Sequence, residues 1–286
     1  MVNKIPSDGI TKGIVLVQFE DQITWVTLNR PEKRNCMNPA LNDDMVRILD
    51  ALEVDDRCEV LVLTGAGDSF SSGMDLKEFF RETDGLPYNQ MMRVRRAAAD
   101  WQWRQLMNFP KPTIAMVNGW CFGGAFTPLI SCDIAIAAED ATFGLSEINW
   151  GIIPAGLVTR MVVESMNVRN AMYYTLTGLP FDGKKAAEIG LVNEAVPKAM
   201  LLKRTIEVAK ILLGKNPHAL RACKQAVRGV QGLPFDLSFD YLGAKIAQMQ
   251  FFDDEKGRSQ GMSQFLDEKS YRPGLQSMSR KKKSRR

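Results

Sequence analysis

Histidine is nearly absent from this chain of 286 residues, which contains His218 and no other. A Ser-His-Asp triad needs a histidine beside its nucleophile, and a multi-histidine metal centre needs several. His218 follows Asn216-Pro217 and is predicted to lie in the first turn of a helix. We therefore expect neither a histidine-dependent triad nor a metal site.

Long apolar runs and paired cysteines are also lacking. No stretch of about 18 apolar residues is present, so we expect no transmembrane span. The opening MVNKIPSDGITKG lacks the apolar run of a signal peptide. The cysteines are odd in number and form no C-x-x-C pair, which predicts reduced thiols in a cytoplasmic protein. They are Cys36, Cys58, Cys121, Cys132 and Cys223.

Acidic residues nearly balance the basic ones once the end of the chain is set aside. The formal net charge is +4, but the last seven residues, RKKKSRR, carry six positive charges. The remainder is therefore slightly acidic, and we expect residues 271–286 to form a disordered basic tail. A tail of this kind either is a solvated terminus or contacts nucleic acid or an acidic membrane.

The hydrophobic pattern predicts an α/β fold as far as Val196 and a helical section after Pro197. We expect domains at 1–197 and 198–270, followed by the tail. The segment 65–72 is predicted to be a loop. The expected strands are Ile14–Phe19, Ile23–Leu28, Val60–Thr64, Thr113–Val117 and Asp133–Ala137, the first two forming a hairpin. The expected helices are Pro39–Glu53, Asp75–Arg81, Asn89–Met107, Ala199–Leu213, Pro217–Val230, Pro234–Gln250 and Glu255–Leu266.

Two glycine turns each precede a predicted helix. In VNGWCFGGAF, Gly123 and Gly124 let the backbone approach a ligand without a Cβ in the way. In FSSGMDLKEF, Met74 offers a second backbone N–H, and Asp75 is a candidate cap for the short helix. Two such donors aimed at one oxygen form an oxyanion hole, and losing one donor typically lowers the rate about 10²–10³-fold. Ordinary strand-to-helix turns would give the same spacing, so the spacing alone does not decide between them.

One carboxylate lies in an apolar, aromatic context. Glu147 is flanked by Phe143, Leu145, Ile148 and Trp150. Burial there would disfavour the charged form and raise the pKa of Glu147 toward neutrality, which suits a group that takes and returns protons. The alternative is a surface glutamate beside an apolar strand.

Five segments together resemble the crotonase (enoyl-CoA hydratase/isomerase) superfamily, and the resemblance runs from about Ile14 to Leu266. The segments are TLNRPEKRNCMN, VLVLTGAGDSFSSGMDLKEF, KPTIAMVNGWCFGGAF, CDIAIAAEDATFGLSEINWGIIP and GLVNEAVP. Within the superfamily, VNGWCFGG, FGLSEINWGI, WQW and FLDEKSYRPGLQ are most similar to hydroxycinnamoyl-CoA (feruloyl-CoA) hydratase-lyases. The resemblance implies a spiral of ββα units with a C-terminal helical section, assembled as a homotrimer or a dimer of trimers.

The resemblance also implies roles for individual residues. Met74 and Gly124 would donate to the thioester oxygen, and Glu147 would serve as acid and base. Thr127 stands where simple hydratases have a second glutamate and hydratase-lyases have a small hydroxyl residue. Trp150 would line the acyl pocket. The segments that hold CoA correspond here to Lys33, Ser72, Gly73, Asp75 and Leu76.

Two positions depart from the family pattern. Hydratase-lyases acting on 4-hydroxycinnamoyl substrates grip the phenol with two tyrosines, which correspond here to Phe79 and Gly243. Tyr241 is close in sequence, but a shift of two residues along a helix turns a side chain by about 200°. We therefore expect an acyl pocket that is enlarged and less polar at its far end.

The resemblance implies hydration of a feruloyl-CoA-like thioester followed by cleavage to a vanillin-like aldehyde and acetyl-CoA. It implies no cofactor, because the CoA thioester is the substrate. Three alternatives stay open: a plain enoyl-CoA hydratase or isomerase without cleavage, a crotonase-like protein whose basic tail binds nucleic acid or membrane, and an inactive relative. Intact Met74, Gly124 and Glu147 argue against the last of these.

Overall fold

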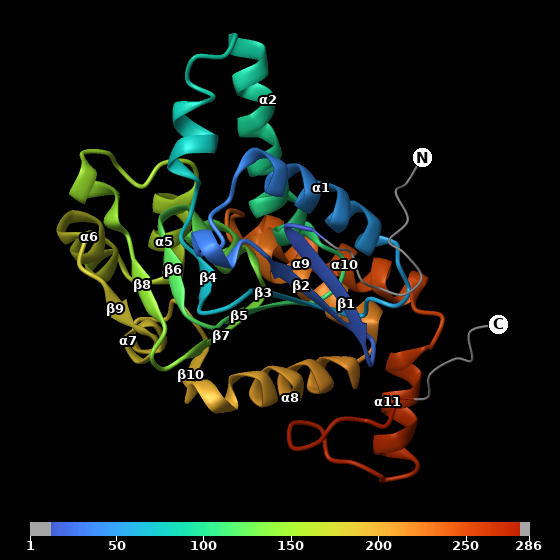
Figure 1. Ribbon diagram of the computed structural model, residues 1–286. Coiled ribbons are helices and arrows are strands. Elements are labelled where there is room, and N and C mark those ends of the chain that lie inside the picture. Colours follow the sequence, from blue (N-terminus) through green and yellow to red (C-terminus); the bar gives the residue numbers. More distant parts are fainter. Residues whose placement is uncertain (1–12, 281–286) are drawn as a thin grey trace. The chain divides into compact units, whose positions relative to one another are not determined.

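The structure is a computed structural model that describes residues 13–280 (Figure 1). The described chain divides into two compact units, one of residues 13–109 and 113–207, the other of residues 110–112 and 208–280. The sequence pattern places the boundary at 197, where the strands end. The division between the units instead falls ten residues later, within a helix.

The first unit contains two sheets. A six-stranded sheet has the order β1-β2-β3-β5-β7-β10, and a four-stranded sheet has the order β4-β6-β8-β9. Only the β1/β2 and β8/β9 pairs are antiparallel in these sheets. The strands are β1 (Val15–Glu20), β2 (Ile23–Leu28), β3 (Val60–Gly65), β4 (Ser69–Ser71), β5 (Thr113–Val117), β6 (Trp120–Phe122), β7 (Ile134–Ala138), β8 (Thr142–Gly144), β9 (Phe181–Asp182) and β10 (Glu194–Val196).

From β3 to β8, successive strands alternate between the two sheets. The pairs β3/β4, β5/β6 and β7/β8 each send the first strand to the six-stranded sheet and the second to the four-stranded sheet. Each pair is followed by a helical segment, namely η2 (Leu76–Arg81), η4 (Gly123–Ala125) with α4 (Phe126–Ser131), and η5 (Ser146–Trp150). This repeat is a spiral of ββα units, and it confirms the predicted fold class.

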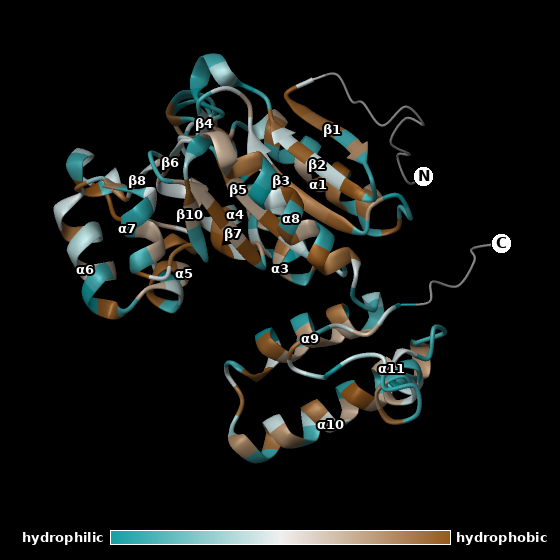
Figure 2. Cartoon of the chain, turned by 90° about the horizontal axis from the view of Figure 1, so that it is seen from below, coloured by the Kyte–Doolittle hydropathy of each residue, from teal (hydrophilic) through white to brown (hydrophobic). Residues whose placement is uncertain are grey.

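The β1/β2 hairpin and the central strands follow from local sequence. Asp21 and Gln22 both have positive φ, 48° and 68°, which gives the turn the twist that the paired strands require. Every residue of β3 is buried, as expected for a parallel strand covered on both faces. The strands β3, β5 and β7 are accordingly coloured largely as hydrophobic in Figure 2.

The prediction of a loop over residues 65–72 is wrong. Ser69–Ser71 forms β4, which pairs in parallel with β6, and Phe70 is fully buried. A three-residue strand is too short to show a periodicity, and its partner lies some 50 residues later in the chain. Tertiary pairing, which no local pattern encodes, makes this segment a strand.

The helices lie close to their predicted ranges. Asn38 caps α1 (Pro39–Glu53) by accepting a hydrogen bond from the Leu41 amide at 2.9 Å. The helix predicted over 89–107 is α2 (Tyr88–Ala99), continued by a π-helical segment, η3 (Asp100–Gln105), and by α3 (Leu106–Asn108). The later helices are α5 (Val158–Ser165), α6 (Val168–Thr177), α7 (Gly183–Glu188), α8 (Leu201–Leu213), α9 (Pro217–Val230), α10 (Phe235–Phe252) and α11 (Gly257–Leu266).

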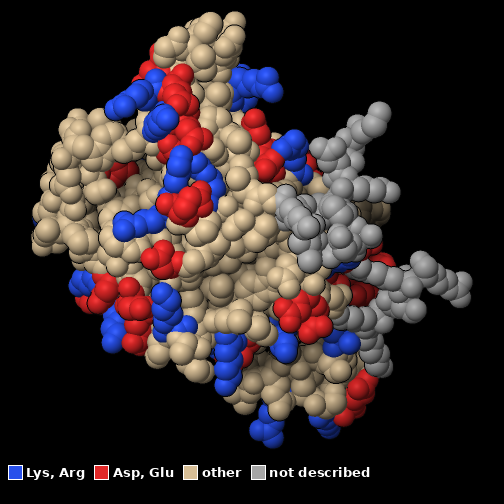
Figure 3. Space-filling model, in the orientation of Figure 1, with Lys and Arg blue, Asp and Glu red and all other residues tan. Residues whose placement is uncertain are grey.

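The second unit is helical and includes part of the segment expected to be a disordered tail. Residues 271–280 are described, and Arg280 forms an ion pair with Glu255 at 2.7 Å in which both side chains are at most 10% exposed. Residues 281–286 lie outside the described residues. On the face drawn in Figure 3, basic and acidic side chains are intermixed. None of the helices in the described part of the chain is long and apolar enough to span a membrane.

Candidate active site

The loop after β4 presents one backbone amide toward a cavity. Gly73 adopts φ +91°, and its carbonyl accepts a hydrogen bond from the Met37 amide at 2.8 Å. The Asp75 amide in turn donates to the Met37 carbonyl at 3.0 Å. The two backbone hydrogen bonds to Met37 therefore use the Gly73 carbonyl and the Asp75 amide, which lie on either side of Met74. Within the described residues, the Met74 amide donates to no protein acceptor.

The second glycine turn follows β6 and begins a helix, as predicted. Gly123 has φ +51° and starts the short helix η4, which continues as α4. Gly124 is thus the second residue of a helix, where an amide has no acceptor within the helix. The helix end adds a partial positive charge to this amide.

The two turns are in direct contact. A Cβ on Gly124 would lie 3.4 Å from the Met74 nitrogen, and a Cβ on Gly73 would lie 3.1 Å from the Gly124 nitrogen. Side chains at either glycine would therefore fill the space between the amides. The geometry brings together the two donors that the sequence singled out, and it can stabilise one developing negative charge.

Glu147 lies beside the second turn. It is 7% exposed, in the helical turn η5 that follows β8. A Cβ on Gly123 would lie only 2.8 Å from its Oε1, so a side chain at this position would displace the carboxylate. Oε2 is buried without a hydrogen-bond partner in the described part of the chain. Desolvation by burial raises the pKa of Glu147, against a smaller lowering effect of its own backbone amide.

A cavity of about 550 Å³ collects most of the predicted site residues. Its lining contains Ser72, Met74, Leu76, Phe79, Gly124, Thr127, Glu147 and Trp150, all from the first unit. Thr127, on α4, is 4% exposed. A buried carboxylate, two unpaired amides and a largely apolar chamber form an arrangement suited to enolate chemistry.

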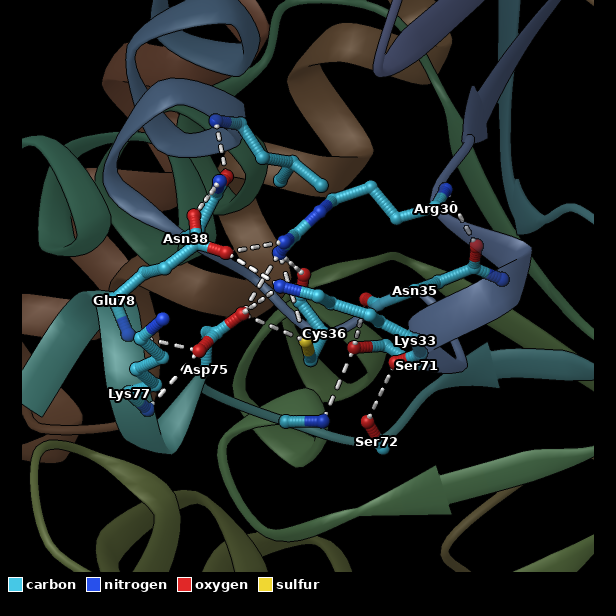
Figure 4. A network of polar contacts seen from close by, with 12 residues as sticks. Arg30, Lys33, Asn35, Cys36, Asn38, Ser71, Ser72, Asp75, Lys77 and Glu78 are labelled. Carbon is cyan, nitrogen blue, oxygen red and sulfur yellow. Dashed lines mark hydrogen bonds and ion pairs between the residues drawn. The ribbon is translucent and has the colours of Figure 1, made fainter.

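Lys33, Gly73 and Asp75 are not among the residues that line this cavity. Lys33 and Asp75 belong to the polar network of Figure 4, which joins residues 30–38 to the loop after β4. The Gly73 amide donates to Ser71 Oγ at 3.1 Å in the same loop. Lys33 Nζ contacts Glu78 Oε1 at 2.6 Å and is 45% exposed, while the Ser72 hydroxyl donates to the Lys33 carbonyl at 3.4 Å. The predicted CoA-binding positions are therefore neighbours in space.

Asp75 anchors this network. It accepts hydrogen bonds from the amides of Lys77 and Glu78, which confirms its predicted role as a helix cap. Arg30 Nη1 contacts Asp75 Oδ2 at 3.1 Å in a pair about 93% buried. Burial by itself would raise the pKa of Asp75, but hydrogen bonds from the Glu78 amide, Cys36 and Arg30 lower it to about 2.

Tyr241 and Gly243 belong to α10 in the second unit. The Tyr241 hydroxyl donates to the Gln225 carbonyl on α9 at 3.1 Å, so the phenol is already engaged within that unit. The role of these two positions in the acyl pocket stays a prediction.

Sequence reasoning missed the contribution of α2 and η3 to the cavity. Arg95, Ala98, Ala99, Gln102 and Trp103 line it. Their spacing of three and four residues places them on one helix face. The WQW motif, residues 101–103, carried a signal for this face. Trp101 is instead fully buried and donates to Asn42 Oδ1 at 2.7 Å.

Comparison with known proteins identifies the family of this chain. A family model described as enoyl-CoA hydratase/isomerase matches residues 18–272. The chain belongs to the enoyl-CoA hydratase/isomerase family. It is 54% identical to a hydroxycinnamoyl-CoA hydratase-lyase from Pseudomonas fluorescens, over 93% of this chain and 96% of that protein. It is 30% identical to a 2,3-dehydroadipyl-CoA hydratase from Escherichia coli (strain K12), over 90% of this chain and 96% of that protein.

Solved structures extend the comparison to the fold. An enoyl-CoA hydratase from Bacillus anthracis superimposes with a TM-score of 0.80 at 26% identity. The match covers 90% of this chain and 97% of that chain. Membership in the enoyl-CoA hydratase/isomerase family, suggested by the sequence motifs, is thereby confirmed.

Proposed function

We propose that this protein hydrates an aromatic enoyl-CoA thioester of the feruloyl-CoA type and cleaves the product to an aromatic aldehyde and acetyl-CoA. The observation that carries the proposal is the buried Glu147 carboxylate, which shares a cavity with the unpaired amides of Met74 and Gly124. Similarity over nearly the whole chain to a protein named hydroxycinnamoyl-CoA hydratase-lyase supports cleavage after hydration.

In the first half-reaction, the thioester oxygen accepts hydrogen bonds from the Met74 and Gly124 amides. Glu147 removes a proton from water as the water oxygen bonds to Cβ. The electron pair of the Cα–Cβ double bond moves into the thioester and forms an enolate. The two amides stabilise the enolate oxygen, and the protonated Glu147 then delivers its proton to Cα.

In the second half-reaction, Glu147 removes the proton of the β-hydroxyl group. The Cβ–O bond becomes a carbonyl as the Cα–Cβ bond breaks, and its electron pair forms the enolate of acetyl-CoA. The aldehyde leaves, and Glu147 returns its proton to the terminal carbon. A raised pKa suits this cycle because Glu147 must act as base and acid in turn.

Other residues bind and orient the substrate in this proposal. The Thr127 hydroxyl positions water or the β-hydroxyl group, and Trp150 and Phe79 line the acyl chamber. Lys33 and the segment Ser72–Leu76 hold CoA, with Lys33 meeting phosphate as a point charge. No step requires a cofactor.

The test is incubation of purified protein with feruloyl-CoA, followed by chromatography of acyl-CoA and aldehyde. We expect vanillin and acetyl-CoA in equal amounts. A 3-hydroxyacyl-CoA product without aldehyde would instead identify a plain hydratase.

Glu147→Gln should retain the fold and lose turnover by more than 10²-fold, since general acid–base groups typically contribute 10²–10⁴-fold. The control is Glu188→Gln, whose parent side chain is 67% exposed, and it should keep full activity.

The family resemblance further supports assembly as a homotrimer or a dimer of trimers in the cytoplasm. Helix α10 carries exposed apolar side chains at a helical spacing, including Phe235 (94% exposed) and Phe239 (80% exposed). Contact with another copy of the chain would remove this surface from water.

A further inference from the structure

The cavity wall formed by Phe79 offers no hydroxyl group to a phenol. Phe79 is 5% exposed and packs edge-to-face with Phe80 at 5.1 Å between ring centroids. Both rings line the cavity, so this wall offers apolar contact to an aromatic substrate. The two rings therefore give this end of the cavity little polarity, as expected from the sequence.

A cation lies beside the same wall. Arg95 lines the cavity, and its guanidinium carbon is 5.8 Å from the Phe79 ring centroid and 5.9 Å from that of Phe80. Among the described residues that line the cavity, Arg95 is the one cation and Glu147 the one anion. Ala98 and Ala99, which have short side chains, follow on the same helix face and line the same cavity.

Within the part of the chain that the structure describes, most N–H donors of Arg95 have no acceptor. Its Nη2 contacts Asp84 Oδ1 at 3.1 Å, in a pair whose side chains are 35% and 62% exposed. An exposed pair of this kind holds a side chain weakly. A guanidinium has five N–H donors, and Asp84 accepts from one nitrogen. The remaining donors can meet an oxygen without breaking a buried interaction.

We propose that Arg95 is the specificity-determining residue for the aromatic ring of the substrate. Its guanidinium donates hydrogen bonds to an oxygen substituent on that ring. The site therefore has its highest affinity for a substrate that carries a phenol. The inference rests on the proposed function and names its substrate class: ring-hydroxylated cinnamoyl-CoA thioesters rather than unsubstituted ones. The phenol oxygen accepts from the guanidinium while its ring packs on Phe79. Arg95 thereby supplies at this wall the polar contact that Phe79 lacks.

The test compares Arg95→Gln with wild type on feruloyl-CoA and on unsubstituted cinnamoyl-CoA. We expect kcat/KM for feruloyl-CoA to fall about 10–100-fold, chiefly through KM, because hydrogen bonds to a charged donor are among the stronger ones. The kcat/KM for cinnamoyl-CoA should change less than about twofold, because an ordinary surface substitution has an effect of that size. Arg95→Lys, which keeps the charge, should recover part of the discrimination. Arg93→Gln, an exposed cation on the same helix, is the matched control and should leave both substrates unaffected.

A binding arm separates this inference from the proposed function. Dissociation constants for both thioesters are measured by calorimetry in the Glu147→Gln background, where no turnover is expected. Loss of the preference for feruloyl-CoA on adding Arg95→Gln supports the inference even if the reaction class is wrong. An equal loss for both thioesters, or an unchanged preference, overturns it. Absence of aldehyde from wild type overturns the proposed function alone.

Discussion

At the scale of single residues, the site depends on one carboxylate held where it is poorly solvated. Glu147 is 7% exposed, its Oε2 lacks a partner in the described residues, and burial raises its pKa. A carboxyl whose pKa is raised on folding binds protons more tightly in the folded state, so its ionisation destabilises the fold as pH rises. The ionised Glu147 carboxylate, which suits proton transfer, therefore lowers the stability of the fold.

The variant Gly123→Ala tests how closely Glu147 must approach the glycine turn. In Gly123→Ala, the added Cβ would lie 2.8 Å from Glu147 Oε1 and would occupy a backbone of φ +51°. The carboxylate must move, and we expect kcat to fall about 10²-fold, as for a misplacement of about 1 Å in a reacting group.

The matched control for this variant is Gly274→Ala, at φ +87° with no atom near the added Cβ. Both variants should lose about 1–2 kcal/mol of unfolding free energy through backbone strain. Only Gly123→Ala should lose activity. Steady-state kinetics and urea denaturation separate the two effects, and equal kcat values in both variants would contradict the prediction.

At the scale of elements, an ion-pair network fixes the loop that presents the Met74 amide. Arg30 contacts both Asp75 and Glu78, and Asp75 caps η2 (Figure 4). Because Asp75 N–H also donates to the Met37 carbonyl, the same residue ties the loop to the segment before α1. The network therefore joins the candidate CoA-binding segment to the candidate oxyanion hole.

Asp75→Asn should destabilise the protein by about 1–3 kcal/mol, because the buried Arg30 guanidinium loses one of its two charge partners among the described residues and keeps Glu78. The pKa of Asp75 is lowered to about 2, so its contribution to stability is present above the unfolded-state pKa and is lost as pH falls from about 4 to about 2. Urea denaturation across this range should show a steep loss of stability in wild type and a shallower loss in the variant. Glu164→Gln, which removes an exposed ion pair with Arg160, should change stability by less than about 1 kcal/mol.

Elements with strong local signals were predictable, and those held by tertiary pairing were not. The cap at Asn38 and the proline after it gave α1 its correct start. The short strand β4 was missed because only its pairing with β6 defines it. The π-helical segment η3 was also missed, since its composition resembles that of an ordinary helix.

At the scale of the whole molecule, the spiral topology assembles the site. Residues 72–74, 123–127 and 147 each follow the second strand of a ββα unit: β4, β6 and β8. These strands are neighbours in the four-stranded sheet, so their ends lie at one edge. Repetition of one unit therefore brings three distant segments to a single cavity.

The proposed assembly is a prediction at the same scale. Light scattering coupled to size-exclusion chromatography should give the mass of three or six chains. Phe235→Asp combined with Phe239→Asp should yield smaller species, because charges would replace exposed rings that are expected to lie in an interface. Asp236→Asn, a neighbouring exposed position, should leave the mass unchanged. A monomeric wild type would refute the assembly.

Motifs, turns and burial patterns are local features, so the amino-acid sequence was enough to predict the family, the α/β class, the paired glycine turns and the carboxylate in an apolar context. Tertiary structure decided what local features cannot express. It placed the Met74 and Gly124 amides side by side, buried Glu147 against Gly123 and brought Arg95 to the cavity. The first two contacts join residues 50 and 24 positions apart in the chain, and they form only when the ββα units stack.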